Sequence, residues 1–305
     1  MQWLECTVPG GDDPEELCNA LAELGVGGMS IENERDFHDF LENNRACWDY
    51  VDEALEESFS GVSRVKFWLS CDAEGEKVLA AVRAAGYSVE TRVIADEDWE
   101  NNWKQYYKPM EIGQRLLVIP QWEQVDPGQR VPLILDPGLT FGTGSHATTR
   151  LCLTALEKTV AQGDRVLDLG CGSGILSIAA LRLGASQALA VDIDDKCLDV
   201  AYENAALNGI GKDRYTVRVG DVLSDGSLRR ELEGSYDIVV ANIVADVIIA
   251  LAPLVPSMLR PGGTFLCSGI IDDRAEEVRA ALEAAGWTVL ETQSADGWFA
   301  YTCRR

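Results

Sequence analysis

Hydrophobic and polar residues follow two different patterns along the chain, and the change between them divides it into two domains. In residues 1–95, short segments of alternating polarity predict strands, and apolar positions at helical spacing lie between them. Two such units predict a smaller N-terminal α+β domain of the ferredoxin-like, split β-α-β type. Its strands are expected at 2–8, 29–32, 62–69 and 87–94, and its helices from Asp13-Pro14 onward and at 74–85.

The second domain, expected over 126–305, alternates strand-like and helical segments. Such alternation predicts an α/β fold, with an open and largely parallel sheet that carries helices on both faces. Ligands of these sheets bind beyond the carboxyl ends of the strands. The strand candidates are 165–169, 188–193, 215–219, 238–241, 264–268, 288–291 and 298–303.

Two further segments interrupt or join the domains. The segment 32–57 is strongly acidic but keeps apolar residues at helical spacing. It is therefore either a solvated helical face or a surface that receives a cationic partner. The segment 96–109 places Trp99, Trp103 and Tyr106 on one helix face, so we expect a linker helix within a junction over 96–125. A strand-like segment follows at 115–119.

The composition is that of a folded protein with a large negative charge. The chain has 305 residues, of which 47% are hydrophobic, and its net charge is -24. Nucleic-acid binding depends on Lys and Arg at phosphates, so we expect no direct nucleic-acid partner and favour a basic macromolecule. Neither a membrane span nor a signal peptide is recognisable, so we expect a cytoplasmic protein without membrane contact.

The number and spacing of the cysteines and histidines limit the possible disulfide and metal sites. The nine cysteines are odd in number, and none of them forms a C-x-x-C pair. Only His38 and His146 are histidines. We therefore expect neither a disulfide framework nor a metal site.

A glycine turn follows the first strand of the second domain. Residues 166–174 read Val-Leu-Asp-Leu-Gly-Cys-Gly-Ser-Gly and lead into a helix predicted over 175–183. Glycines let the backbone turn sharply and let a ligand approach closely. Asp192 ends the next strand, where a carboxylate can accept both hydroxyls of a ribose, so the pair predicts a nucleoside cofactor. Dinucleotide folds prefer G-x-G-x-x-G, whereas here the spacing is G-x-G-x-G and position 175 is Ile.

The glycine turn resembles motif one of the class I methyltransferases. Two more segments, 136–150 and 240–245, resemble the bacterial methyltransferases that modify large-subunit ribosomal protein L11, and this resemblance covers essentially the whole chain. It implies a Rossmann-like seven-stranded catalytic domain, an N-terminal substrate-recognition domain, S-adenosylmethionine as cofactor and ribosomal protein L11 as substrate. The implied product is a trimethylated lysine ε-amine, N-terminal α-amine or both, made by a monomeric enzyme.

Carried over position by position, the resemblance also implies the site residues. Asn242 is the expected catalytic residue and a cofactor contact. The chain departs from the family at Ser145, Ala147 and Val244, where the family usually has Thr, Pro and Leu. These differences leave the local loop path and the fit of the substrate open. The other expected cofactor-binding residues are Thr149, Gly170, Gly172, Asp192, Asp221, Phe141, Thr143 and His146.

The implied chemistry needs a neutral amine. A lysine amine with a pKa of about 10.4 is mostly protonated at neutral pH and lacks its lone pair. The carbonyl of Asn242 can orient the nitrogen without stabilising the ammonium as a carboxylate would, and a nearby sulfonium lowers the pKa of the amine. The alternative interpretation is that Asn242 is only a turn residue at the end of a strand. His146 is either a general base or a loop residue bonded to the cofactor or the backbone.

Other functions stay open at this stage. A methyltransferase acting on a glutamine amide would carry Asn-Pro-Pro-Tyr at 242–245, and one acting on RNA would need a basic surface. A nicotinamide-dependent dehydrogenase would bind a dinucleotide. A non-catalytic module would bind the cofactor and transfer nothing.

Overall fold

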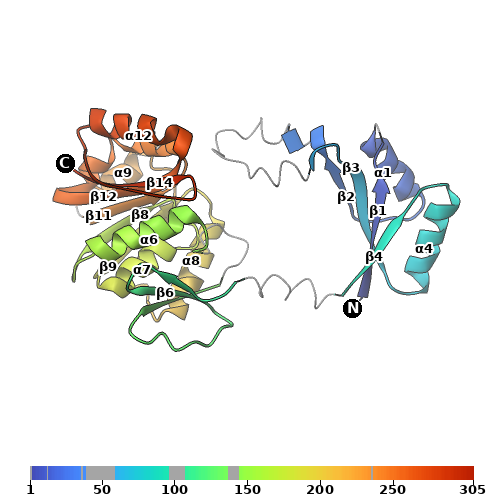
Figure 1. Cartoon of the computed structure of the whole chain (residues 1–305), viewed down its shortest axis with the longest axis horizontal. Coiled ribbons are helices and arrows are strands. Elements are labelled where there is room, and N and C mark those ends of the chain that lie inside the picture. The colour runs from blue at the N-terminus through green and yellow to red at the C-terminus, as the bar shows by residue number, and fades with distance from the viewer. Residues whose placement is uncertain are drawn as a thin grey trace. The chain divides into compact units, whose positions relative to one another are not determined.

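The chain forms two compact units, Met1–Tyr107 and Lys108–Arg305 (Figure 1). The computed structural model describes residues 2–11, 13–35, 37–38, 59–95, 107–136, 144–234 and 236–305. The expected linker helix with Trp99, Trp103 and Tyr106 lies outside the described residues, as does most of the acidic segment 32–57.

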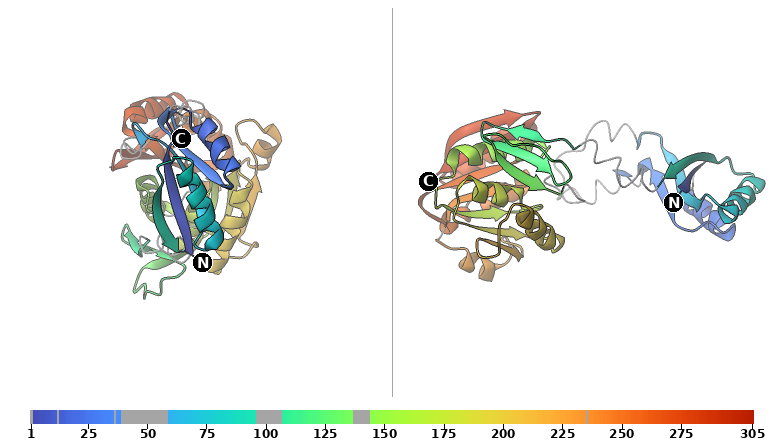
Figure 2. Two further views of the ribbon diagram at one scale, coloured as in Figure 1. Left: turned by 90° about the vertical axis from the view of Figure 1, so that its right-hand side faces the viewer. Right: turned by 90° about the horizontal axis from the view of Figure 1, so that it is seen from below.

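The first unit is a four-stranded antiparallel sheet with two helices on one face. The strand order is β2-β3-β1-β4, and the helices lie side by side on the same face (Figure 2, left). The order of elements along the chain is that of the ferredoxin-like fold, so the predicted α+β fold is confirmed. The elements are β1 (Gln2–Pro9), α1 (Pro14–Glu23), β2 (Met29–Asn33), β3 (Ser63–Ser70), α4 (Ala73–Ala84) and β4 (Glu90–Ala95).

Alternation along the strands builds the core of this unit. In β3, Val65 and Phe67 are fully buried, whereas Trp68 on the opposite face keeps 36% of its surface exposed. The buried side chains belong to one cluster with Leu21 of α1 and Val82 of α4. Because successive strand residues point to opposite faces, this pattern determines which face the helices cover.

The second unit is built on a seven-stranded sheet in the order β10-β9-β8-β11-β12-β14-β13. The strands from β10 to β12 in this order are parallel, and β14 and β13 are antiparallel to their neighbours. All seven predicted strands are found, so the predicted α/β fold is confirmed. They are β8 (Arg165–Leu169), β9 (Gln187–Asp192), β10 (Tyr215–Val219), β11 (Tyr236–Asn242), β12 (Leu259–Ile271), β13 (Thr288–Ala295) and β14 (Trp298–Arg304).

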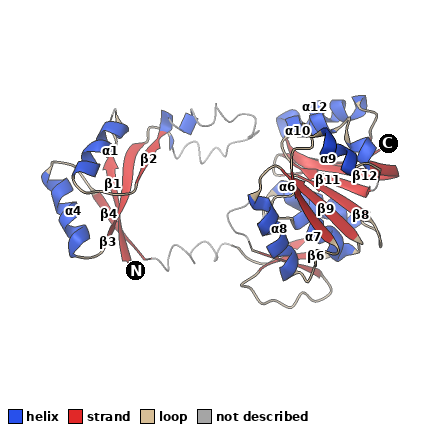
Figure 3. Cartoon of the chain, turned by 180° about the vertical axis from the view of Figure 1, so that it is seen from behind, coloured by secondary structure: helices blue, strands red, loops and turns tan. Residues whose placement is uncertain are grey.

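Helices cover both faces of this sheet, and each face has its own core (Figure 3). Val166 and Val240 lie in the first cluster, and their neighbours Leu167 and Val239 lie in the second. No described helix combines the length and apolar character that a membrane span requires. The first cluster includes α6 (Ala147–Thr159), α7 (Ile175–Leu183) and α8 (Lys196–Leu207), and the second α9 (Gly226–Glu231), α10 (Ala245–Leu251), α11 (Val255–Met258) and α12 (Asp272–Ala284).

A three-stranded sheet adds to the predicted elements. It consists of β5 (Met110–Ile112), β6 (Leu116–Pro120) and β7 (Val131–Leu135), with β5 antiparallel and β7 parallel to β6. Only β6 coincides with a strand-like segment of the sequence, 115–119. The sheet belongs to the second unit, although β5 and β6 fall inside the junction expected over 96–125.

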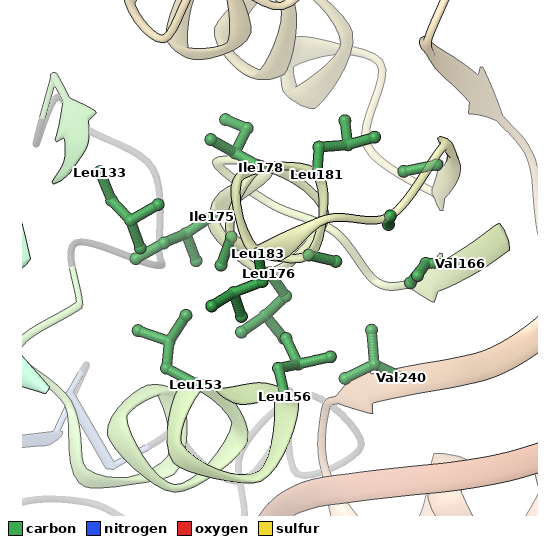
Figure 4. Packing of buried hydrophobic residues seen from close by; sticks show 14 of the residues in the cluster. Leu133, Leu153, Leu156, Val166, Ile175, Leu176, Ile178, Leu181, Leu183 and Val240 are labelled. Carbon is green, nitrogen blue, oxygen red and sulfur yellow. The ribbon is translucent and has the colours of Figure 1, made fainter. Parts of the chain in front are cut away.

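Buried aliphatic side chains join this small sheet to the large one. Leu133 of β7, Leu153 of α6 and Ile175 of α7 belong to one cluster, which extends to Val166 and Val240 of the large sheet (Figure 4). Each such side chain stabilises the fold by about 1.5–3 kcal/mol when fully buried. The cluster therefore holds the start of α7, and with it the preceding glycine turn, from two sides.

Candidate functional site

The turn between β8 and α7 needs glycine at several positions. Gly170, Gly172 and Gly174 have φ values of +74°, +51° and +78°, in the left-handed region that favours glycine. A Cβ on Gly170 would also lie 2.4 Å from Cγ2 of Ile243, and one on Gly174 would lie 2.7 Å from the hydroxyl of Tyr215. Side chains at Gly170 and Gly174 are therefore excluded both by the backbone angles and by the surroundings, and the turn carries side chains only at Cys171 and Ser173.

Asp192 lies directly against this turn, as the sequence predicts. It ends β9, and its Oδ2 accepts a hydrogen bond from Gly172 N at 2.8 Å. Its Oδ1 accepts one from Asp194 N at 3.0 Å. The adjacent β10 is tied to the same point, since Gly220 N donates to the Asp192 carbonyl oxygen at 2.8 Å. The glycine turn and Asp192 thus lie together at the carboxyl edge of the large sheet.

Asp221 follows β10 at this edge, but its carboxylate is largely used within its own turn. Oδ2 accepts from Ser224 Oγ at 2.7 Å, and Oδ1 accepts from Leu223 N at 2.8 Å. The Ser224 and Leu223 hydrogen bonds lower the pKa of Asp221, so it stays ionised. The structure therefore gives Asp221 a clear role in shaping the turn.

Asn242 ends β11, the strand next to β8 in the sheet. Its Nδ2 donates to Thr149 Oγ1 of α6 at 3.4 Å, so the structure brings together two residues that are 93 positions apart. Its Oδ1 is buried and has no hydrogen-bond partner. An unpaired buried carbonyl oxygen is rare and costs free energy. This oxygen is therefore a candidate contact for a ligand.

The backbone after Asn242 is held by close contacts on both sides. Ile243 N donates to the carbonyl oxygen of Ser268 on β12 at 3.0 Å. A Cβ on Gly269 would lie 2.3 Å from the carbonyl oxygen of Ile243, and Gly269 has a φ of +90°. Gly170 approaches the Ile243 side chain from the opposite strand. Two glycines thus let β8 and β12 fix the position of Asn242.

His146 caps the helix that carries Thr149. Its Nδ1 lies 2.8 Å from Thr148 Oγ1, and Thr148 N donates to the same nitrogen at 3.4 Å. Its ring meets that of Trp298 edge to face, with centroids 4.9 Å apart. Burial, and secondly the charge of Arg150, lower the pKa of His146, so the ring is neutral at pH 7. A backbone hydrogen bond was one of the two roles predicted for this residue.

Asp168, in β8, is a feature that the sequence analysis does not assign to the site. It is fully buried, and its Oδ2 accepts from Ser177 Oγ at 2.7 Å and Ser177 N at 3.1 Å. Burial raises its pKa to about 7, and its Oδ1 has no hydrogen-bond partner. It thereby ties β8 to the first turn of α7, across the glycine turn.

Two predicted cofactor residues, Phe141 and Thr143, lie outside the described residues. In the part of the chain that is described, no group of three or more His, Cys, Asp or Glu side chains is placed to hold a metal ion. The predicted residues that the structure does bring to one edge are Gly170, Gly172, Asp192, Asp221, Asn242, Thr149 and His146.

Comparison with known proteins agrees with this architecture. The family model described as ribosomal protein L11 methyltransferase (PrmA) matches residues 2–305. Relatives with that name from Pelotomaculum thermopropionicum and Thermoanaerobacter pseudethanolicus are 42% and 38% identical and align over 100% of this chain and 99% and 100% of their own. A crystal structure of ribosomal protein L11 methylase from Lactobacillus delbrueckii subsp. bulgaricus, 34% identical, matches with a TM-score of 0.59 and covers 65% of this chain and 99% of that one. The chain belongs to the ribosomal protein L11 methyltransferase family, as its motifs predict.

Proposed function

We propose that this chain transfers methyl groups from S-adenosylmethionine to amines of ribosomal protein L11, giving trimethylated lysine ε-amines, a trimethylated N-terminal α-amine or both. Membership of the family supports the methyl donor and the protein substrate. The observation that carries the choice of an amine is the unpaired, buried Oδ1 of Asn242, at the end of the strand beside the glycine turn.

The residues at this edge fit S-adenosylmethionine. The bare backbone at Gly170 and Gly172 leaves room for a closely packed nucleoside. Each carboxylate oxygen of Asp192 accepts a backbone hydrogen bond, from Gly172 or Asp194, and keeps acceptor capacity for a ribose hydroxyl. The cofactor has no phosphate, which suits the buried Ile175 at the position where dinucleotide folds have their third glycine. When bound, it supplies a methyl group on a positively charged sulfur. An amine can attack the carbon of that methyl group in line, with the sulfur as leaving group.

Asn242 orients the amine. Its Nδ2 is engaged by Thr149, so Oδ1 is the end of the amide left to accept an N–H of the incoming nitrogen. A carboxylate at this place would raise the pKa of the amine and hold it in the protonated, unreactive form, whereas a neutral amide does so far less. Proton loss before transfer is needed because a free lysine has a pKa of about 10.4.

His146 holds the helix end rather than removing the proton. Its Nδ1 is engaged by Thr148, and its ring packs against Trp298. The position of Thr149, and hence of the Asn242 amide, depends on the first turn of α6 that His146 caps. We propose that the amine proton leaves to solvent.

The charge of the chain suits a basic protein substrate. A net charge of -24 attracts a cationic partner and repels nucleic acid. We propose that the first unit serves as the substrate-recognition domain and that the enzyme acts as a cytoplasmic monomer without nucleic-acid contact. Electrostatic attraction of this kind predicts that the association rate with free L11 falls as ionic strength rises.

Mass spectrometry of purified L11 after incubation with the protein and S-adenosylmethionine tests the proposal. We expect mass gains of whole methyl groups, and peptide mapping is expected to place them on lysines, the N-terminus or both. L11 with acetylated lysines, used as a control, separates the two acceptors. An L11 left unmodified, while ribosomal RNA or a glutamine amide gains methyl groups, would contradict the proposal.

A further inference from the structure

Two buried asparagines hold the edge strand β7, Asn204 in α8 and Asn208 directly after the end of α8. Asn208 exchanges two hydrogen bonds with Ile134, since its Oδ1 accepts from Ile134 N at 2.9 Å and its Nδ2 donates to Ile134 O at 2.7 Å. Asn204, one turn earlier, accepts from Asp136 N at 2.9 Å through its Oδ1. The two asparagines are 8% and 1% exposed. Buried amides of this kind are tolerated because they are hydrogen-bonded.

Asn204 also makes a bond that Asn208 lacks. Its Nδ2 donates to the carbonyl oxygen of Ser173 at 2.9 Å, and this bond is buried. Ser173 lies in the glycine turn, between Gly172 and Gly174. One side chain thus joins the glycine turn to Asp136, the residue that follows β7.

Gly144, where the described part of the chain resumes after Asp136, also lies beside the glycine turn. A Cβ on Gly144 would lie 3.3 Å from Cδ1 of Ile175. Ile175 is the first residue of α7, directly after Gly174. The two described ends of the connection between β7 and α6 are therefore both tied to residues that flank Gly174. Asp136 is joined to Ser173 through Asn204, and Gly144 lies beside Ile175.

We propose that Asn204 is a positioning residue of the cofactor site. By holding Ser173 and Asp136 together, it sets the place of the glycine turn relative to the connection that leads to His146 and Thr149. The affinity for S-adenosylmethionine depends on this spacing, because the predicted cofactor contacts lie on both segments. The inference rests on the proposed function only in taking S-adenosylmethionine as the ligand of the glycine turn.

Calorimetric titration with S-adenosylhomocysteine tests this role against a purely structural one. Asn204→Ala removes both bonds, and we expect its Kd to rise about tenfold, as for the loss of roughly one net hydrogen bond. The matched control Asn208→Ala removes bonds to the same strand from the end of the same helix, together with the bond from Asn208 Nδ2 to the Asn204 carbonyl oxygen. It is expected to lower Tm as Asn204→Ala does, while its Kd stays within about twofold of wild type. In kinetic assays, Asn204→Ala should raise KM for S-adenosylmethionine more than it lowers kcat.

Asn204→Asp preserves the volume and adds a second readout. A carboxylate still accepts from Asp136 N but cannot donate to the Ser173 carbonyl, and protonation restores the donor. We therefore expect weaker binding than wild type at pH 8 and a deficit that shrinks as pH falls. A deficit that is independent of pH would assign the loss to packing and overturn the proposal.

The outcomes for the two proposals differ. If wild-type protein itself fails to bind S-adenosylhomocysteine, the proposed function is wrong. If wild type binds and both Asn204 variants bind equally well, with only Tm lowered, the positioning role alone is wrong.

Discussion

The two units use their polar side chains differently. In the first unit, Glu32 of β2 forms ion pairs with Arg64 and Lys66 of the neighbouring strand. In the second unit, Asp168 and Asn242 lie near the carboxyl edge of the sheet, and each has a buried oxygen without a hydrogen-bond partner. The polar groups of the first unit thus complete its fold, whereas those of the second leave bonding capacity for something else.

This difference indicates that an unpaired buried oxygen is a useful sign of a ligand site. An unpaired buried oxygen costs about 1–3 kcal/mol, so a side chain with only a structural role would be expected to pair it. Charge is a weaker indicator, because both units are acidic and surface ion pairs contribute little. The unpaired oxygens of Asp168 and Asn242 therefore locate the site more sharply than the net charge does.

The largest effect is expected for a substitution in the core of the first unit. It tests whether this core stabilises the unit independently of the site. Leu21 is fully buried, and Leu21→Ala should lower the free energy of unfolding by about 2–5 kcal/mol. Affinity for S-adenosylhomocysteine should not change, because the predicted cofactor residues are in the second unit. Denaturant unfolding and calorimetry measure the two quantities. Val93→Ala, at a side chain that is 59% exposed, is the control with a small effect on both. Loss of cofactor binding in Leu21→Ala would show that the units are not independent.

The next effect concerns the unpaired oxygen itself. Asn242→Ala is expected to reduce kcat about 100-fold at saturating cofactor and substrate, as for other groups that align reacting atoms. Asn242→Asp, the near-isosteric control, should also be slow at neutral pH because its carboxylate keeps the amine protonated. Single-turnover assays with L11 measure the rate. Wild-type turnover in Asn242→Ala would remove Asn242 from the catalytic role.

A smaller effect is expected in the glycine turn. Gly170→Ala places a Cβ 2.4 Å from Ile243 at a φ of +74°, so both strain and collision disturb the turn. Its Kd for S-adenosylhomocysteine should rise about tenfold. Gly163→Ala is the matched control, since Gly163 has a φ of +92° but nothing within 4 Å of its Cβ. It should cost about 1 kcal/mol of stability with unchanged affinity. Equal affinities in the two variants would mean that the turn does not contact the ligand.

The smallest effect is expected at His146. Burial lowers its pKa, so its contribution to stability is present above the ordinary histidine value and is lost as pH falls through the lower folded value. His146→Asn keeps a capping side chain and removes this titration. Acid unfolding should become less steep, while the apparent pKa values of the kcat/KM profile stay where they are. A shift of the acidic limb of that profile would instead identify His146 as a general base.

Elements with strong periodicity could be predicted from the sequence. The helix expected over 175–183 is found as Ile175–Leu183, because its apolar run is bounded by Gly174 and Gly184. The seven strands of the large sheet were accessible for the same reason, since glycine turns and polar residues separate their apolar runs. The glycine turn and Asp192 could be paired because parallel strands end at one edge.

Other parts depend on contacts that a linear pattern does not contain. β5 has only three residues and β7 includes Pro132, so neither shows a clear strand period. The start of α6 at Ala147 is hidden because its cap is a histidine, outside the usual capping residues. Asp168 and Asn204 are polar residues that a sequence pattern places toward solvent, and only the packing of α7 and β7 buries them.

The central claim is that the carboxyl edge of the large sheet holds the methyl donor between the glycine turn and Asn242. A crystal of the protein soaked with S-adenosylhomocysteine tests this most directly. We predict density along Gly170 and Gly172, with the ribose on Asp192 and the amino-acid end beside Asn242. Density for the ligand elsewhere on the chain, or an edge that takes up NAD in its place, would contradict the account.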